Sequence, residues 1–186
     1  MKNRIVAVVG MCGAGKSEVV NIFEKNGYAK VYFGDVTFDE IKKRGLEVNW
    51  ENEKKIREEF RASGDMGIYA KLNEPKISKL YNAGENVCVE SMYSWSEYKY
   101  LKEKFGDDFF VVCVVSNLQV REARLANREI RPMTKQQIKD RDYSEIENIE
   151  KGGPIGRADL YIINNNSMED LKKQTNEIIW YLDSID

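Results

Sequence analysis

Residues 10–17 read Gly-Met-Cys-Gly-Ala-Gly-Lys-Ser, which has the spacing G-x-x-x-x-G-K-[ST] of a phosphate-binding loop. Glycines let successive backbone N–H groups turn toward phosphate oxygens, and a helix that follows adds partial positive charge at its N-terminus. Lys16 is expected to reach the β- and γ-phosphates, and the Ser17 hydroxyl to ligate Mg²⁺. The residues expected to hold the triphosphate are Gly10, Cys12, Gly13, Ala14, Gly15, Lys16, Ser17 and Glu18. This pattern predicts binding of a nucleoside triphosphate such as ATP.

Such a loop works only between a buried strand and the start of a helix, and both flanks are present. The apolar run 5–9 precedes it, and residues 16–26 follow as a predicted helix with Gly27 at the stop position. Further strand candidates are residues 29–33, 86–90, 109–115 and 160–163.

Predicted helices separate these strands. Asn49 can cap a helix over 50–62, Thr134 opens one toward residue 149, and Ser167 opens the last one. Strands that alternate with helices predict an α/β fold, with a five-stranded parallel sheet between two helical layers.

Composition narrows the class of protein. A chain of 186 residues fits a single domain with its own core. The 29 basic and 31 acidic residues give no reason to expect nucleic acid or a membrane as the main partner. Three cysteines without a C-x-x-C pair fit a reducing cytoplasm, and the start of the chain does not read as a signal peptide. Because the chain has no histidine, mechanisms that need imidazole are excluded.

A charged, glycine-spaced insertion covers residues 34–84, and an arginine-rich segment covers 121–150. Together with the phosphate-binding loop, these segments resemble the P-loop nucleoside-monophosphate kinase group. Within that group the chain is most similar to poorly characterised nucleotide kinases related to adenylate kinase and dephospho-CoA kinase. The matching segments, in order, are Gly34-Asp35, residues 43–47, Arg121-x-x-Arg124-Leu with Arg128, Arg141-Asp142 and residues 158–164. The resemblance implies a three-layer αβα P-loop fold, a helical insertion that binds the acceptor, and a lid whose arginines close over phosphates.

Phosphoryl transfer explains why arginines would lie in a lid. Negative charge spreads over the transferring group, and a guanidinium pairs with phosphate through two parallel hydrogen bonds. Arg121, Arg124 and Arg128 would share one helix face if the helix continues that far. Arg124 and Arg128 are the expected catalytic pair, and Arg141 could join them from the second arm of the lid. A solvated basic face is the alternative interpretation.

The sequence departs from the family pattern at the acceptor phosphate. Related kinases carry one arginine shortly after strand two and another after strand three. Here Phe38 occupies the first place, and residues 90–93 (Glu-Ser-Met-Tyr) contain none. Arg44, Arg57 or Arg61 could substitute from the insertion. Aromatic residues near these positions could also form a base-stacking pocket, of which we expect one or two members to contact the acceptor: Trp50, Tyr69, Tyr81, Tyr93, Trp95, Tyr98 and Tyr100.

Two carboxylates follow strands at the edge where ligands bind in parallel sheets. Glu90 is expected to orient Mg²⁺, with a surface glutamate as the alternative. Asp35 could accept the proton of a hydroxyl acceptor, or only orient a phosphate acceptor, or cap the next helix. The sequence therefore predicts a nucleotide kinase-like phosphotransferase that uses ATP and Mg²⁺. The alternatives are a hydroxyl-acceptor kinase of the dephospho-CoA kinase type and a nucleotide-binding regulator without kinase activity.

Overall fold

A computed structural model describes residues 3–185 of the chain. The strands are β1 (Ile5–Val9), β2 (Ala29–Tyr32), β3 (Val87–Glu90), β4 (Phe109–Val115) and β5 (Leu160–Ile163). The helices are α1 (Lys16–Lys25), α2 (Asp35–Lys43), α3 (Trp50–Arg61), α4 (Ile68–Asn82), α5 (Trp95–Phe105), α6 (Leu118–Ala126), α7 (Lys135–Glu147), α8 (Gly152–Gly156) and α9 (Met168–Ser184). A short 3-10 helix, η1 (Gly106–Asp108), precedes β4.

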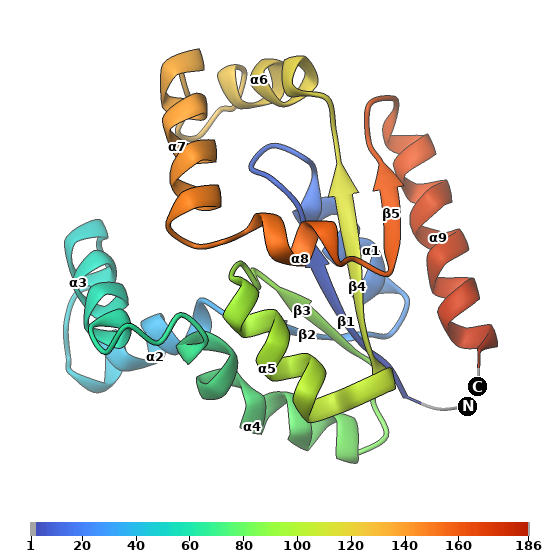
Figure 1. Cartoon of the computed structure of the whole chain (residues 1–186), viewed down its shortest axis with the longest axis horizontal. Helices are drawn as coiled ribbons and strands as arrows, with labels where there is room; N and C mark the ends of the chain where they lie inside the picture. The colour runs from blue at the N-terminus through green and yellow to red at the C-terminus, as the bar shows by residue number, and fades with distance from the viewer. Residues whose placement is uncertain (1–2, 186) are drawn as a thin grey trace.

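The five strands form one parallel sheet in the order β2-β3-β1-β4-β5. Strand β1 therefore lies in the centre, paired with β3 on one side and β4 on the other. Figure 1 shows the strands running in the same direction, so that the segments after them meet at one edge. The predicted α/β fold with a five-stranded parallel sheet is confirmed, and each observed strand lies within one residue of its predicted range.

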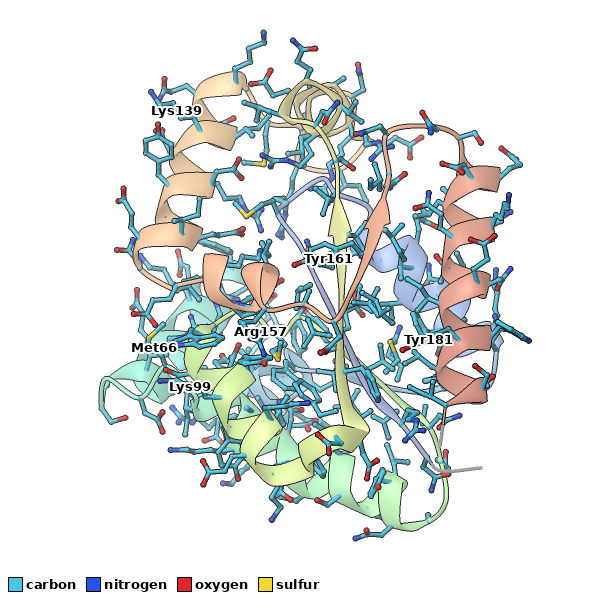
Figure 2. The ribbon with its side chains drawn as sticks, turned by 45° about the vertical axis from the view of Figure 1, so that its right-hand side comes forward. Met66, Lys99, Lys139, Arg157, Tyr161 and Tyr181 are labelled. Atoms are coloured by element: carbon cyan, nitrogen blue, oxygen red, sulfur yellow. The ribbon has the colours of Figure 1, made fainter. Side chains whose placement is uncertain are left out.

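The two faces of β1 bury different helices. Ile5, Ala7 and Val9 face a cluster that includes Ala70 of α4 and Leu101 of α5. Val6 and Val8 face the opposite cluster, which contains Val19 and Phe23 of α1 and Leu171 and Ile179 of α9. Figure 2 shows α9, with Tyr181, on one side of the sheet and α5, with Lys99, on the other. Because both faces are covered, the sheet is the middle of three layers.

The segment 34–84 folds as three helices with different surroundings. Helix α4 packs on the sheet through Tyr69, Ala70 and Ile77. Helices α2 and α3 project away from the sheet at the edge that carries the phosphate-binding loop (Figure 1). Across that edge, α6 and α7 form the arginine-rich segment. A helical arm therefore flanks the loop on each side. Within residues 3–185, no helix is both long and apolar enough to span a membrane.

The close packing of Gly10 gives a test of the loop's geometry. A Cβ atom at Gly10, whose φ is +137°, would lie 2.3 Å from the Val114 carbonyl oxygen in the neighbouring strand. We expect Gly10→Ala to lower the free energy of unfolding by about 3 kcal/mol, because two central strands would have to separate. Gly84→Ala is the matched control, since Gly84 has φ +90° but nothing within 4 Å, and should cost about 1–2 kcal/mol. Equal losses in urea denaturation would contradict a steric origin.

Candidate active site

The phosphate-binding loop joins β1 to α1 at the centre of the sheet. Gly13 and Gly15 both have positive φ, +80° and +98°, which residues with a side chain rarely adopt. Helix α1 begins at Lys16, and its N-cap residue Gly15 provides no side chain to bond the first-turn N–H groups. Those N–H groups remain available to an anion, as the predicted phosphate site requires.

A cavity of about 380 Å³, which we call the donor cavity, opens over this loop. The loop residues that line it are Cys12, Gly13, Gly15, Lys16, Ser17 and Glu18, and the others are Glu90, Ser91, Tyr93, Arg124, Arg128 and Arg141. Gly10 and Ala14, also predicted to bind the triphosphate, do not line it. They lie behind the loop, where the Ala14 carbonyl accepts a hydrogen bond of 2.8 Å from Asn164 Nδ2.

Lys16 lies at the floor of the donor cavity and has an unusual pKa. Its Nζ donates to the carbonyl of Met11 at 3.0 Å. Burial, reinforced by the positive charge of Lys151, lowers the pKa of Lys16 from 10.5 to about 8. A bound phosphate would place negative charge beside the Lys16 ammonium group and so stabilise its charged form.

Two oxygen-bearing side chains fit the magnesium ion that a phosphate-binding loop implies. The Ser17 hydroxyl lies 3.4 Å from Glu90 Oε1, although α1 and β3 are far apart in the sequence. Magnesium prefers oxygen ligands and is often held by one or two protein groups together with substrate phosphates and water. Ser17 and Glu90 would hold the ion in this way, and the ion would neutralise charge on the triphosphate. Ser91, directly after Glu90, has φ +70°, a conformation that costs energy for a non-glycine residue and is common at ligand sites.

The arginine-rich segment does not form the single basic face that the spacing allowed. Helix α6 ends at Ala126, so Arg128 lies beyond it. Arg121 is buried and forms two hydrogen bonds, of 3.1 and 2.6 Å, with Asp142 of α7. It also donates to the carbonyl of Cys12 at 3.0 Å. Arg121 therefore links the loop to both arms of the segment, and its guanidinium is already occupied.

Arg124 and Arg128 both line the donor cavity, as the prediction of a phosphate clamp requires. Arg124 is fixed by hydrogen bonds to Ser116 Oγ and to both the carbonyl and the side-chain oxygen of Asn164, at 3.0–3.2 Å. Arg128 is exposed to solvent at the mouth of the cavity. Asn164 was absent from the predicted site, because nothing in its sequence surroundings shows that it lies under the loop.

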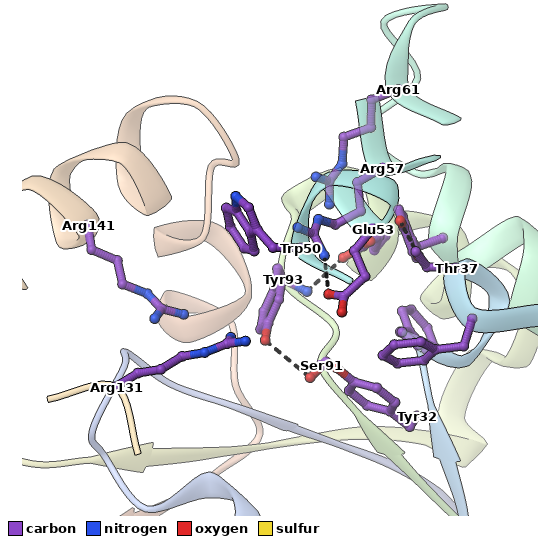
Figure 3. A pocket seen from close by; sticks show the side chains of 15 residues that line it. Tyr32, Thr37, Trp50, Glu53, Arg57, Arg61, Ser91, Tyr93, Arg131 and Arg141 are labelled. Atoms are coloured by element: carbon purple, nitrogen blue, oxygen red, sulfur yellow. Dashed lines mark hydrogen bonds and ion pairs between the residues drawn. The ribbon is translucent and has the colours of Figure 1, made fainter. Parts of the chain in front are cut away.

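A second cavity of about 550 Å³, the acceptor cavity, lies between α3 and the arginine-rich segment. Figure 3 shows Arg57 and Arg61 entering it from α3, with Arg131 and Arg141 on the opposite side. Aromatic rings form much of its wall: Tyr32, Phe33, Phe38, Trp50, Tyr69 and Tyr93. The cavity thus combines cations with planar apolar surfaces.

Two predicted substitutes for the missing arginines reach this cavity, and one does not. The Arg57 guanidinium lies 5.1 Å from the Trp50 ring centroid and bonds Glu53 at 3.0 Å. The Arg61 guanidinium lies 5.0 Å from the ring centroid of Tyr69. Arg44 instead pairs with Glu40 and Glu59, at 2.7 and 2.6 Å, and does not line the cavity.

The candidate aromatic residues divide between the acceptor cavity and the core. Trp50, Tyr69 and Tyr93 line the acceptor cavity, and the expectation that one or two of them contact the acceptor stays a prediction. The others serve the core. Trp95 and Tyr98 stack at a centroid distance of 4.8 Å, while Tyr81 and Tyr100 pack against the cluster under α4 and α5.

Glu97 is a buried carboxylate of the acceptor cavity that the sequence analysis missed. Its Oε2 accepts hydrogen bonds from the backbone N–H groups of Tyr93 and Ser94, at 2.6 and 2.7 Å. Burial raises its pKa above the usual value, despite these hydrogen bonds. The Ser94-x-x-Glu97 capping box at the start of α5 was the available signal.

Asp35 lies near Ser17 and Glu90 but outside the acceptor cavity. It is the first residue of α2 and not its N-cap, a position that Gly34 occupies, so the capping alternative is wrong. Its carboxylate pairs with Lys76 of α4 at 3.1 Å. It lines a shallower hollow together with Ser17 and Glu90. An acceptor group would have to extend into that hollow to meet it.

The chain matches a family model described as an AAA domain over residues 6–150. Among curated proteins, it is 31% identical to the UPF0200 protein TK1334 of Thermococcus kodakarensis over 182 residues, covering 94% of this chain and 98% of that one. A UPF0200 protein of Thermococcus onnurineus is also 31% identical, over 178 residues that cover 94% and 96% of the two chains.

Solved structures with similar folds include several kinases. TT1252 from Thermus thermophilus superposes with a TM-score of 0.66 and 15% identity over the whole of both chains. Dephospho-CoA kinase from Campylobacter jejuni gives 0.58 with 19% identity, covering 97% of each chain. Shikimate kinase from Aquifex aeolicus gives 0.61 with 16% identity, covering 96% of each. At these identities the likeness establishes the fold, and the predicted resemblance to P-loop kinases is confirmed.

The lowered pKa of Lys16 predicts proton uptake on ATP binding. Well below pH 8 the lysine is charged in free and bound protein alike, and binding takes up almost no proton there. Above it the free protein holds a neutral lysine that phosphate recharges, so affinity should fall by up to about tenfold per pH unit. Calorimetry at about pH 6.5 and about pH 9.5, in buffers of different ionisation enthalpy, measures this uptake. Lys16→Arg is the control, because arginine stays charged. No proton uptake at the higher pH would contradict the prediction.

Proposed function

We propose that this chain, which belongs to the UPF0200 protein family and has the fold of P-loop kinases, transfers the γ-phosphoryl group of ATP to a nucleotide-like small molecule. The observation that carries the proposal is the meeting of two cavities. The donor cavity contains the phosphate-binding loop, and the acceptor cavity shares Ser91, Tyr93 and Arg141 with it. A donor phosphate and an acceptor group could therefore lie side by side.

The lining of the acceptor cavity supports an acceptor that bears a phosphate. Four arginines and two glutamates contribute charge to that lining: Arg57, Arg61, Arg131, Arg141, Glu53 and Glu97. The excess of two positive charges matches an anion. Aromatic rings stack on nucleobases with little dependence on sequence, so the same cavity suits a base.

Each proposed catalytic residue has a physical role in this transfer. Lys16 would contact the triphosphate, while Ser17 and Glu90 would hold Mg²⁺. Arg124 and Arg128 would pair with the phosphate oxygens as charge develops on them. Catalysis would come from position and charge, because phosphate acceptors need no general base.

A hydroxyl acceptor is the second candidate, and the position of Asp35 favours it. The Asp35 carboxylate lines a hollow with Ser17 and Glu90, where a hydroxyl near the metal site could give up its proton. Pairing with Lys76 weakens this candidate, because an acceptor hydroxyl would have to compete with the Lys76 ammonium for the Asp35 carboxylate.

A phosphotransfer screen tests the main proposal. ATP and Mg²⁺ are combined with a panel of nucleoside monophosphates, nucleosides and sugars, and ADP formation is followed. We expect acceptor-dependent ADP formation with at least one nucleoside monophosphate, and none in Lys16→Ala, because loss of the charge-assisted contact costs about 2–4 kcal/mol of triphosphate binding. If the parent binds ATP but no acceptor raises ADP formation above the Lys16→Ala background, the regulator without kinase activity is favoured instead.

Asp35→Asn separates the two acceptor classes, since it keeps the shape of the side chain but removes the base. With a phosphate acceptor we expect a change mainly in acceptor affinity, and any pH dependence of the rate should persist. With a hydroxyl acceptor the rate should fall about 10²–10⁴-fold and the acidic limb of the pH profile should vanish. Asp39→Asn, an exposed change on the same helix, is the control. A large loss of turnover at unchanged acceptor affinity would overturn the phosphate acceptor.

A further inference from the structure

Three residues line both the donor and the acceptor cavity: Ser91, Tyr93 and Arg141. A phosphoryl group that moves from one cavity to the other must pass them. Arg141 is the only cation of the three. The two arginines of the predicted clamp, Arg124 and Arg128, differ from Arg141 because they line the donor cavity but not the acceptor cavity.

One carboxylate orients the Arg141 guanidinium. Its Nε donates to Glu145 Oε1 at 3.0 Å, one turn further along α7. Within residues 3–185, neither terminal nitrogen of Arg141 has a hydrogen-bond partner. The side chain is therefore anchored through Nε, while the two groups that can pair with a phosphate are left open toward the cavities (Figure 3).

A buried lysine holds the same carboxylate from the other side. Lys151 Nζ lies 2.6 Å from Glu145 Oε2, and only 2% of its side chain is exposed. The ammonium also lies 4.4 Å from the ring centroid of Tyr93, itself one of the three shared residues. Each carboxylate oxygen of Glu145 thus pairs with one cation, Oε1 with Arg141 and Oε2 with Lys151. Both cations raise the stability of the ionised form and keep the Glu145 pKa below its usual value, although burial alone would raise it.

We propose that Glu145 and Lys151 are positioning residues that aim Arg141 at the phosphoryl group in transit. This inference rests on the proposed function. In the transfer, the bond between the γ-phosphorus and the β–γ bridging oxygen breaks, and ADP leaves with the electron pair. An oxygen of the acceptor phosphate forms the new bond to phosphorus, and Arg141 contributes charge without exchanging a proton. The Lys151 ammonium acts indirectly: it holds the Glu145 carboxylate in place, and that carboxylate orients Arg141.

A purely structural role for the buried pair is the competing explanation, and the choice of variants separates the two. Removing one partner leaves a buried charge unpaired, which destabilises the fold whatever the pair does. The double variant Glu145→Gln/Lys151→Met removes both charges while keeping similar side-chain volumes. It should unfold at a temperature close to that of the parent, yet it no longer anchors Arg141 by an ion pair.

We expect the double variant to lower kcat about 10²-fold, because a small misplacement of a group that contacts the transition state has an effect of that size. The KM for ATP should stay near the parent value. In an Arg141→Ala background the same two changes should cause no further loss, since they act only through Arg141. The matched control is Glu122→Gln/Lys135→Met, which removes a pair at 3.7 Å between the half-buried Glu122 of α6 and the exposed Lys135 of α7. Neither residue lines either cavity, so this variant should keep parent turnover.

Two results would overturn the inference: parent-like kcat in the double variant, or a further loss in the Arg141→Ala background. The proposed function fails by a different result, namely no transfer by the parent to any acceptor. In that case calorimetry with ADP, Mg²⁺ and aluminium fluoride, which imitates the transferring group, still tests the aim of Arg141. The double variant should bind this mixture about 10²-fold more weakly than the parent while its affinity for ADP alone is unchanged. Equal affinities for the mixture would overturn the inference.

Discussion

The pairing of two carboxylates of α7 with the buried cations Arg121 and Lys151 is the constraint on which the site depends. Asp142 and Glu145 lie three residues apart and are both buried, so they share the face of α7 that looks toward the loop. Asp142 binds Arg121, and Glu145 binds Arg141 and Lys151. Breaking a buried pair by removing one partner typically costs about 3–5 kcal/mol, so the Arg121–Asp142 pair, whose arginine also bonds Cys12, fixes α7 against the loop more firmly than a surface pair could.

This arrangement limits how the arginine-rich segment can move. Arg121 bonds both Asp142 and the Cys12 carbonyl, which ties the base of the segment to the phosphate-binding loop. The tip contains Arg128 and Arg131, which are exposed, and within residues 3–185 neither side chain forms a hydrogen bond or an ion pair. Closure over a substrate would therefore involve the tip more than the base. A rigid base is useful, because charge stabilisation needs groups that are already in place when the reaction occurs.

The fold and the phosphate-binding loop could be predicted from the sequence, but only part of the candidate site could be. Local patterns placed β1, β4 and β5 at their observed bounds, because apolar runs bounded by turns encode buried strands directly. The spacing of Arg121 and Arg128 suggested one face, yet α6 ends at Ala126. The partner of Arg121 lies 21 residues away in the chain, and no local pattern specifies such a contact. Lys151 has no sequence signature either, since only the tertiary fold brings it beside Glu145 and Tyr93.

Arg57 and Arg61 would replace, by a different physical solution, the two acceptor-side arginines that related kinases carry and this chain lacks. Arg57 and Arg61 lie against the rings of Trp50 and Tyr69, and such stacking leaves the edge of a guanidinium free to donate. Arg44 shows the contrast, because its two carboxylate partners occupy its donors at the surface. An aromatic ring orients a cation and leaves its charge in place, whereas a carboxylate orients the cation and also neutralises its charge. A cavity that must attract an anion is therefore better served by arginines on aromatic rings, and a carboxylate is added where, as at Arg57 and Arg141, it also fixes the direction of the guanidinium.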